Sequence, residues 1–223
     1  MQARRGETRA GESADSEIRW TETAKGLRAI GDRSVRLVIW RNAVPGSVRR
    51  GLAPDARGLP EGRFRFAAAE GCDALSAIFG GARPDLAAAL ARLARATAVA
   101  LDARAIDLRL EMVLHDSCRL FHVDYVPARL IATLIGPGTE YLPDAAVRRA
   151  GLGRGDNRGI CRDWRALLRL PAGAAGLFKG ALSDAGCEGA AVHRSPPIEA
   201  TRETRYLAVF DAVRPISRAS RCR

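Results

Sequence analysis

Residues 119–143, "RLFHVDYVPARLIATLIGPGTEYLP", set the expected architecture of this chain. Residues 119–125 and 128–135 are apolar runs of strand length, and "GPG" at 136–138 is a turn signal. The two runs are too close together for a helical crossover between them. Two polar residues, His122 and Asp124, stand one residue apart inside the first run. The stretch therefore predicts adjacent antiparallel strands, with a histidine and an aspartate on one of them.

The regions on either side also have apolar residues at regular spacing, which predicts further strands and helices. In residues 105–115, apolar side chains stand at the even positions from Ile106 to Leu114, and Asp107, Arg109, Glu111 and His115 fall on the opposite face. Further strands are predicted at 33–41, within 170–180, within 189–195 and at 205–213. Earlier in the chain, apolar residues at helical spacing predict helices at about 73–79, with Asp73 as N-cap and Gly80-Gly81 as stop, and at 84–102.

Helices followed by short strands indicate an α+β chain that is mainly β, built as an antiparallel sandwich or barrel. We expect one domain at 17–213, helical over about 17–104 and β over about 105–213. Residues 1–16 are polar and predicted to be disordered, and 214–223 form a basic tail. Residues 144–165 are rich in arginine and glycine and read as a long loop-like insertion.

The formal charge of +11 does not by itself indicate nucleic-acid binding. Only two of the 36 basic residues are lysine, and the arginines are interleaved with acids instead of forming a stripe with stacking aromatics. We therefore regard nucleic acid as an unlikely partner. The polar N-terminus resembles neither a signal nor a transit peptide, and no apolar run is long enough to span a membrane. Five scattered cysteines without a CxxC pair fit the reducing cytoplasm.

His122 and Asp124 would project from the same side of a strand, roughly 6–7 Å apart at the backbone. A metal site needs a third ligand, and His193 is the best candidate, because His115 lies on a solvated face. Two histidines and one carboxylate form the facial set that binds Fe(II) and leaves positions open. A zinc site that uses Cys118 or Cys187 with histidine is an alternative. In a third reading, the His-x-Asp pair is accidental.

The phrases "FHVD", "GPGTE" and "VHRSPP", with "RYLAVFD" downstream, carry a resemblance. They resemble the domain of unknown function 1826, an uncharacterised bacterial family, over roughly residues 105–213 and more loosely before them. The order of parts is also similar to that of iron and 2-oxoglutarate-dependent oxygenases of the prolyl-hydroxylase-like branch. That resemblance implies a double-stranded β-helix, a cupin-like or jelly-roll-like barrel, with the N-terminal helices packed on it.

The resemblance also implies roles for residues. His122, Asp124 and His193 would hold Fe(II), and Arg205 would pair with the distal carboxylate of 2-oxoglutarate. Residues with a further implied role are Arg202, Arg129 and Thr133 for the cosubstrate, and Tyr141, Glu140, Thr139 and Lys179 at the mouth of the site.

Three functions are consistent with these features. The leading hypothesis is an Fe(II)/2-oxoglutarate dioxygenase that hydroxylates a substrate which the sequence does not identify. The second is a non-enzymatic metal-binding protein on the same scaffold, with zinc as the alternative metal. The third is recognition of a sugar or nucleotide by a cupin-like barrel without metal. The oligomeric state is left open.

Overall fold

The computed structural model describes residues 4–5, 17–52 and 58–213. Strands predominate, and they form two sheets of seven and four strands. The tails predicted at 1–16 and 214–223 lie outside the described residues, except for the two-residue strand β1 (Arg4–Arg5). None of the described helices has the length and apolar character that crossing a bilayer requires.

The larger sheet is antiparallel except at one edge, where β2 and β3 run parallel. It reads, in spatial order, β2 (Ile18–Thr21), β3 (Leu37–Trp40), β9 (Ala175–Lys179), β6 (Ala128–Ile135), β11 (Arg205–Val213), β5 (Ala105–Val113) and β4 (Gly62–Ala67). The strands predicted at 128–135 and 205–213 are confirmed with their bounds. The predicted antiparallel character therefore holds for most of the sheet.

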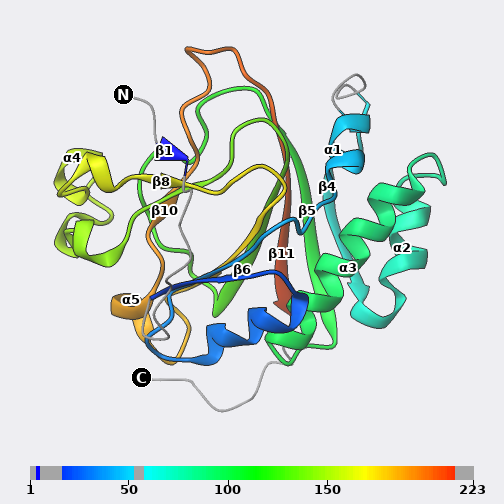
Figure 1. Cartoon of the computed structure of the whole chain (residues 1–223), viewed down its shortest axis with the longest axis horizontal. Coiled ribbons are helices and arrows are strands. Elements are labelled where there is room, and N and C mark those ends of the chain that lie inside the picture. The colour runs from blue at the N-terminus through cyan, green and yellow to red at the C-terminus, as the bar shows by residue number, and fades with distance from the viewer. Residues whose placement is uncertain (1–3, 6–16, 53–57, 214–223) are drawn as a thin grey trace.

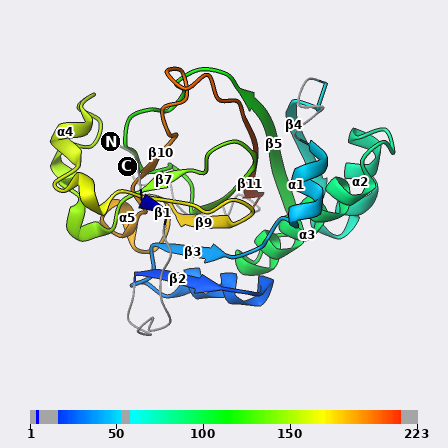
Figure 2. The same ribbon diagram turned by 45° about the horizontal axis from the view of Figure 1, so that its top comes forward.

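The smaller sheet consists of two-residue strands in the order β1, β8 (Leu168–Arg169), β7 (Glu140–Tyr141) and β10 (His193–Arg194). β7 pairs with both β8 and β10 in antiparallel fashion. Figure 2 shows β1, β7 and β10 beside the larger sheet, on the side that faces away from α3.

The central part of the larger sheet is covered on both faces, and the side-chain alternation of its strands shows this. On β11, Tyr206 and Phe210 point into the cluster shared with the helices, whereas Leu207 and Val209 point into the cluster between the two sheets. Because successive side chains of a strand face opposite ways, β11 carries apolar residues at every position from Tyr206 to Phe210. We call the side that carries Leu207 and Val209 the inner face.

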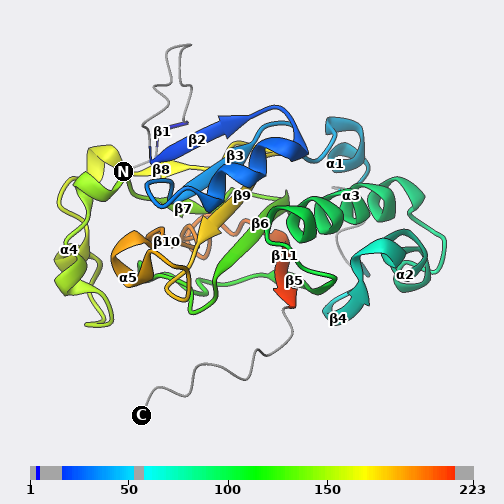
Figure 3. The same cartoon turned by 90° about the horizontal axis from the view of Figure 1, so that it is seen from below.

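Helices cover the other face. The 17-residue α3 (Pro84–Ala100) packs its buried stripe on the sheet, and η1 (Ala24–Gly31), α1 (Gly46–Leu52), η3 (Ala68–Glu70) and α2 (Gly71–Ile78) lie around it. Figures 1 and 3 show α1, α2 and α3 together on one side of the molecule. The stop at Gly80-Gly81 is confirmed by positive φ angles of 55° and 72°. Asp73 is not the N-cap, because α2 already begins at Gly71 as a continuation of η3.

Three predicted strands differ in detail. β3 is buried at all four positions and does not alternate, because both of its faces are covered. β5 ends at Val113, so Leu114 is exposed and does not continue the apolar face. Residues 119–125 form no strand: their one bridge joins His122 to His193. Backbone groups in this segment bond elsewhere, for example the Phe121 N–H, which donates to the side chain of Asn157.

The segment 144–165 is not a featureless loop. It folds into η4 (Asp144–Ala146), η5 (Arg149–Gly151), α4 (Asn157–Ile160) and the start of η6 (Trp164–Ala166). These turns enclose an apolar cluster of their own, in which Val147, Ile160 and Cys161 pack with Phe121 and Val192. Val192 precedes His193, so the cluster braces the chain next to that histidine. The short α5 (Gly186–Gly189) leads into the same region.

Candidate metal centre

The two histidines of the predicted triad are joined through their backbones. The His122 N–H donates to the carbonyl of His193, and the His193 N–H donates to the carbonyl of His122, both at 3.0 Å. This reciprocal pair brings the rings together, with centroids 4.6 Å apart at 53°. Residues 71 positions apart in the chain therefore present their imidazoles at one place.

Each imidazole is oriented by a carbonyl two residues earlier. Nδ1 of His122 lies 2.9 Å from the oxygen of Leu120, and Nδ1 of His193 lies 3.2 Å from that of Ala191. A carbonyl oxygen can only accept, so Nδ1 carries the proton and a neutral ring leaves a lone pair on Nε2. Burial and the neighbouring His193 lower the pKa of His122, which favours the neutral ring. Metal-binding histidines are commonly oriented in this way.

Asp124 completes the cluster. Its Oδ2 lies 3.3 Å from Nε2 of His193, and its Oδ1 lies 3.8 Å from Nε2 of His122. The potential ligand atoms of the three residues all lie within 4.8 Å of one another. Oδ2 is buried and accepts no hydrogen bond from the described residues. A buried carboxylate oxygen that faces two lone pairs is unfavourable unless a cation lies between them, so the donor set fits a divalent metal.

The carboxylate is held by a second pair of charges. Nη1 of Arg129 donates to Asp124 Oδ1, while Nε and Nη2 of Arg129 donate to the two oxygens of Asp211, all at 2.7 Å. Burial acts to raise the pKa of Asp124, but its contacts with His193 and the charge of Arg129 outweigh burial and lower the pKa to about 2. Asp124 is therefore ionised at neutral pH, as a metal ligand must be.

Aromatic side chains form the walls. Phe178 on β9 stacks against His193 with centroids 4.6 Å apart, and Tyr141 on β7 pairs directly with His193 across the smaller sheet. Phe178 and Tyr141 are buried, whereas the His122 side chain is 36% exposed. The cluster is thus enclosed on the His193 side and accessible from the His122 side.

Arg205 lies nearby on the inner face and is fully buried. Its guanidinium donates to the carbonyl of Pro137 at 2.8 Å, to Ser195 Oγ at 2.9 Å and to Thr139 Oγ1 at 3.3 Å. Ser195 stands two residues after His193, which links this arginine to the cluster. No carboxylate among the described residues lies within ion-pair distance of Arg205. Burial, with the charge of Arg169, lowers the pKa of Arg205 to about 10, so it stays charged at neutral pH.

The structure brings some of the predicted cosubstrate and mouth residues to this region and not others. Thr139 bonds Arg205, and Thr133 on β6 lies opposite Leu207 with its buried Oγ1 unbonded among the described residues. Arg129 is engaged by Asp124 and Asp211 instead. Arg202 is exposed in a turn with φ of 53°.

Two mouth candidates face elsewhere. Glu140 is buried and pairs with Arg169 and Arg194, on the side of β7 opposite to Tyr141. Lys179 follows Phe178 on β9, so it points to the other face of the sheet, where its ammonium donates to the carbonyl of Asp32. Strand alternation explains both: a neighbour of an inward residue points outward.

Sequence reasoning missed Ser195, Asp211 and Phe178. Ser195 had a usable signal, because in an extended segment it shares a side with His193. Asp211 and Phe178 had no such signal, because their neighbours depend on strand register. The register places Arg129 of β6 between Asp211 of β11 and Phe178 of β9.

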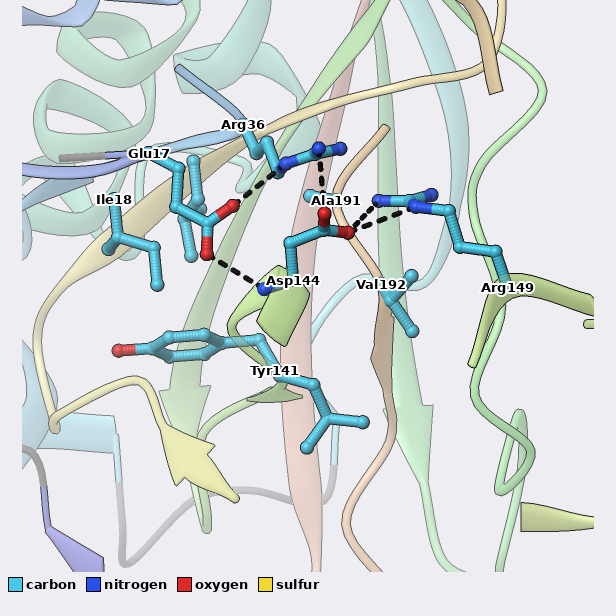
Figure 4. Close-up of a pocket in the computed structure, with 10 residues that line it drawn as sticks. Glu17, Ile18, Arg36, Tyr141, Asp144, Arg149, Ala191 and Val192 are labelled. Atoms are coloured by element: carbon cyan, nitrogen blue, oxygen red, sulfur yellow. Dashed lines mark hydrogen bonds and ion pairs between the residues drawn. The ribbon is translucent and has the colours of Figure 1, made fainter. Parts of the chain in front are cut away.

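A neighbouring small cavity, shown in Figure 4, is lined by an ion network and not by the metal-ligand candidates. Arg36 pairs with Glu17 and Asp144, and Asp144 pairs with Arg149. Arg149 in turn donates to the carbonyl of Ala190. The network ties the segment 144–165 to β3 and to the chain that leads into His193, so its role is structural.

Comparison with known proteins gives a distant likeness and a family. The fold aligns with an N-substituted L-amino acid dioxygenase from Burkholderia ambifaria at 15% identity and TM-score 0.44, over 84% of this chain and 86% of that one. It aligns with a prolyl-4-hydroxylase from Pseudomonas putida at 17% identity and TM-score 0.41, over 85% and 95%. The dioxygenase for auxin oxidation 1 from Arabidopsis thaliana aligns at 11% identity and TM-score 0.46, over 91% and 96%.

No curated protein matches the sequence. The family model "Protein of unknown function (DUF1826)" matches residues 21–211, which confirms the family expected from the sequence. The chain belongs to the DUF1826 family.

Proposed function

We propose that this chain is an Fe(II)/2-oxoglutarate-dependent dioxygenase whose two sheets form a double-stranded β-helix. One observation carries the proposal. His122 and His193 each donate Nδ1–H to a backbone carbonyl and turn Nε2 toward the ionised carboxylate of Asp124. These residues would hold the metal through three ligands, and the exposed side of His122 gives access for small molecules.

Arg205 supports 2-oxoglutarate as the cosubstrate. A buried guanidinium without a carboxylate is unfavourable, and a carboxylate that accepts two of its N–H groups would correct this. Three of its five N–H groups are used by Pro137, Ser195 and Thr139, which leaves one on each terminal nitrogen. The unbonded hydroxyl of Thr133 on the same inner face offers a further hydrogen bond.

When iron and 2-oxoglutarate are bound, they supply the activation of O2, with conversion of 2-oxoglutarate to succinate and CO2 and hydroxylation of a substrate. The chain itself has three tasks. Asp124, fixed by Arg129, neutralises part of the metal charge. Phe178 and Tyr141 exclude water beside His193. Arg205 orients the cosubstrate by its distal carboxylate.

The test is succinate formation by the iron-loaded protein with 2-oxoglutarate, together with metal content. H122A and D124A should lose metal and turnover, while H115A, which removes the exposed third histidine of the chain, should keep both. R205Q should weaken 2-oxoglutarate binding by about 10-fold or more, since a charge-assisted bidentate contact contributes roughly 1.5–3 kcal/mol. R202Q is its exposed control. Retention of both metal and turnover by H122A and D124A would refute the proposal.

A non-enzymatic zinc protein is the second candidate, because the same donor set also binds zinc. Among the described residues the metal-ligand group contains no cysteine, which argues against Cys118 or Cys187 as ligands. Tight zinc binding with no detectable 2-oxoglutarate binding would favour this candidate, and would leave the buried charge of Arg205 without a role.

A further inference from the structure

The inner face of the larger sheet continues past the metal centre as a polar, open surface. A hollow of about 280 Å³ lies there, over β4, β5, β11 and the start of β6. Its charged lining residues are four arginines and two aspartates: Arg63, Arg65, Arg109, Arg129, Asp107 and Asp211. Arg129 also donates to Asp124, so one guanidinium both lines the hollow and touches a metal-ligand candidate.

Strand register explains how these residues meet. Arg65, Asp107, Asp211 and Arg129 form one row across β4, β5, β11 and β6. Each aspartate in this row is paired, Asp107 with Arg65 and Asp211 with Arg129. The row is therefore neutral, and its two carboxylates are not available to other cations.

The next row is not balanced. Arg63 stands directly opposite Arg109 across β4 and β5. Like charges in this position repel each other. Arg109 has one acidic neighbour, Glu111, at 3.4 Å, and Arg63 has no ion pair among the described residues. Two guanidinium groups thus face solvent in a hollow with excess positive charge.

We propose that this hollow binds the anionic end of the substrate, a carboxylate or a phosphate, with Arg63 and Arg109 as its ligands. The proposal rests on the proposed function, since it takes the metal centre as the reacting end. A guanidinium pair is suited to either anion, because its N–H groups match the oxygens in pairs. The side chains of Phe64 and Leu108, which lie between these arginine rows, point to the helix-covered face of the sheet and leave the hollow to the charged residues.

The sheet also fixes the length of the substrate. β5 and β4 lie two and three strand spacings from β6, which corresponds to about 10–14 Å at roughly 4.8 Å per strand. Arg129 on β6 contacts Asp124, so we expect the anionic group and the reacting atom to be separated by roughly that distance. A molecule of this size spans several carbon–carbon bonds, larger than a simple amino acid.

The experiment measures the binding of phenyl phosphate, benzoate and the neutral benzamide to the full chain. Binding is monitored by the side-chain Nε–H NMR signals of Arg63 and Arg109. We expect one of the two anions to bind at least tenfold more tightly than benzamide, and the preferred anion identifies phosphate or carboxylate. R63Q and R109Q should reduce that preference about tenfold each. R154Q, an exposed arginine without a side-chain contact among the described residues, should keep it.

Equal binding of all three probes, or an equal loss in R154Q, would overturn the proposal. The variants should remain folded, because Arg63 is exposed and Arg109 is half-buried. Succinate formation without substrate is measured alongside. If the wild type forms no succinate, the proposed dioxygenase function is wrong. If succinate forms normally but the protein shows no preference for anions, only the proposal that the hollow binds the substrate anion is wrong.

Discussion

Asp211 tests whether the arrangement around Asp124 prepares it to bind metal. Asp211 touches none of the metal-ligand candidates and acts only through Arg129, to which it accepts two hydrogen bonds of 2.7 Å. In D211N the arginine loses its balancing charge and one of its fixed contacts. Its positive charge then stands beside a divalent cation, and its grip on Asp124 loosens. Both changes weaken metal binding.

The magnitude follows from the position of Asp211. Removing an outer partner of a metal ligand typically lowers metal affinity by about 10–100-fold, or roughly 1.4–2.8 kcal/mol. The effect on folding should be smaller. An asparagine still accepts one hydrogen bond, and repulsion from Asp107, which lies directly opposite Asp211, is relieved. We expect the free energy of unfolding of the apoprotein to fall by only about 1 kcal/mol.

The assay is titration of the metal-free protein with Fe(II) under anaerobic conditions, alongside denaturant unfolding. D107N is the matched control: it removes the same charge from the facing strand, where Asp107 pairs with a largely exposed arginine, Arg65. That pair should contribute at most about 1 kcal/mol and not touch metal affinity. Equal metal affinity in D211N and wild type would show that Arg129 does not prepare Asp124.

Three further predictions concern the scaffold. L90A, at a fully buried position of α3, should lower the free energy of unfolding by about 2–5 kcal/mol, and V99A on the exposed side of the same helix by less than about 0.5 kcal/mol; similar losses would contradict the packing. G136A should destabilise by more than G153A, because both glycines have φ near 80° but only at Gly136 would a Cβ meet a backbone oxygen, Thr204 O at 2.1 Å. The G153A loss should be about 1 kcal/mol by thermal unfolding, and equal losses would refute the close approach. Asp116 accepts from the N–H groups of Glu199 and Ile198, which lower its pKa below 3.8, so its stabilisation is complete above that pH and is lost as pH falls below it. D116N should therefore be less stable than wild type at pH 7, and a gap that does not narrow in acid would be inconsistent with this.

The sequence predicted those parts of the fold in which one periodicity dominates. β5, β6, β11 and α3 were predicted within a few residues, because their apolar residues recur at strand or helix spacing. Residues 119–125 were wrong as a strand. Their apolar residues serve a separate cluster with the segment 144–165, and their backbone bonds go to side chains and loops, neither of which periodicity reports.

In the candidate site, too, the sequence predicted some features and not others. His122, Asp124 and His193 could be selected because few residue types bind metals and the chain has only three histidines. The arginines could not be sorted in this way. Arg129 and Arg205 have different partners because they lie at opposite ends of the inner face, and that depends on register across β6, β11 and β5. The places of Glu140 and Lys179 at the mouth stay predictions; each faces away from its inward neighbour, Tyr141 or Phe178, because one residue along a strand reverses the face.

Because residues 119–125 form no regular strand, a few backbone contacts suffice to orient the three metal-ligand candidates. In a regular strand, both neighbours would engage the backbone of His122 and Asp124. Here a single bridge to His193 fixes both histidines, and each then directs Nδ1 to the carbonyl two residues before it, Leu120 or Ala191. The two antiparallel segments thus repeat one local arrangement, and their Nε2 atoms converge without a shared element. Asp124, beyond the bridge, is held through its carbonyl, which accepts from the Ala181 N–H at 2.8 Å, and Arg129 holds its carboxylate beside the two rings. The absence of a regular strand at 119–125, which the apolar periodicity did not predict, is therefore what allows His122, Asp124 and His193 to converge.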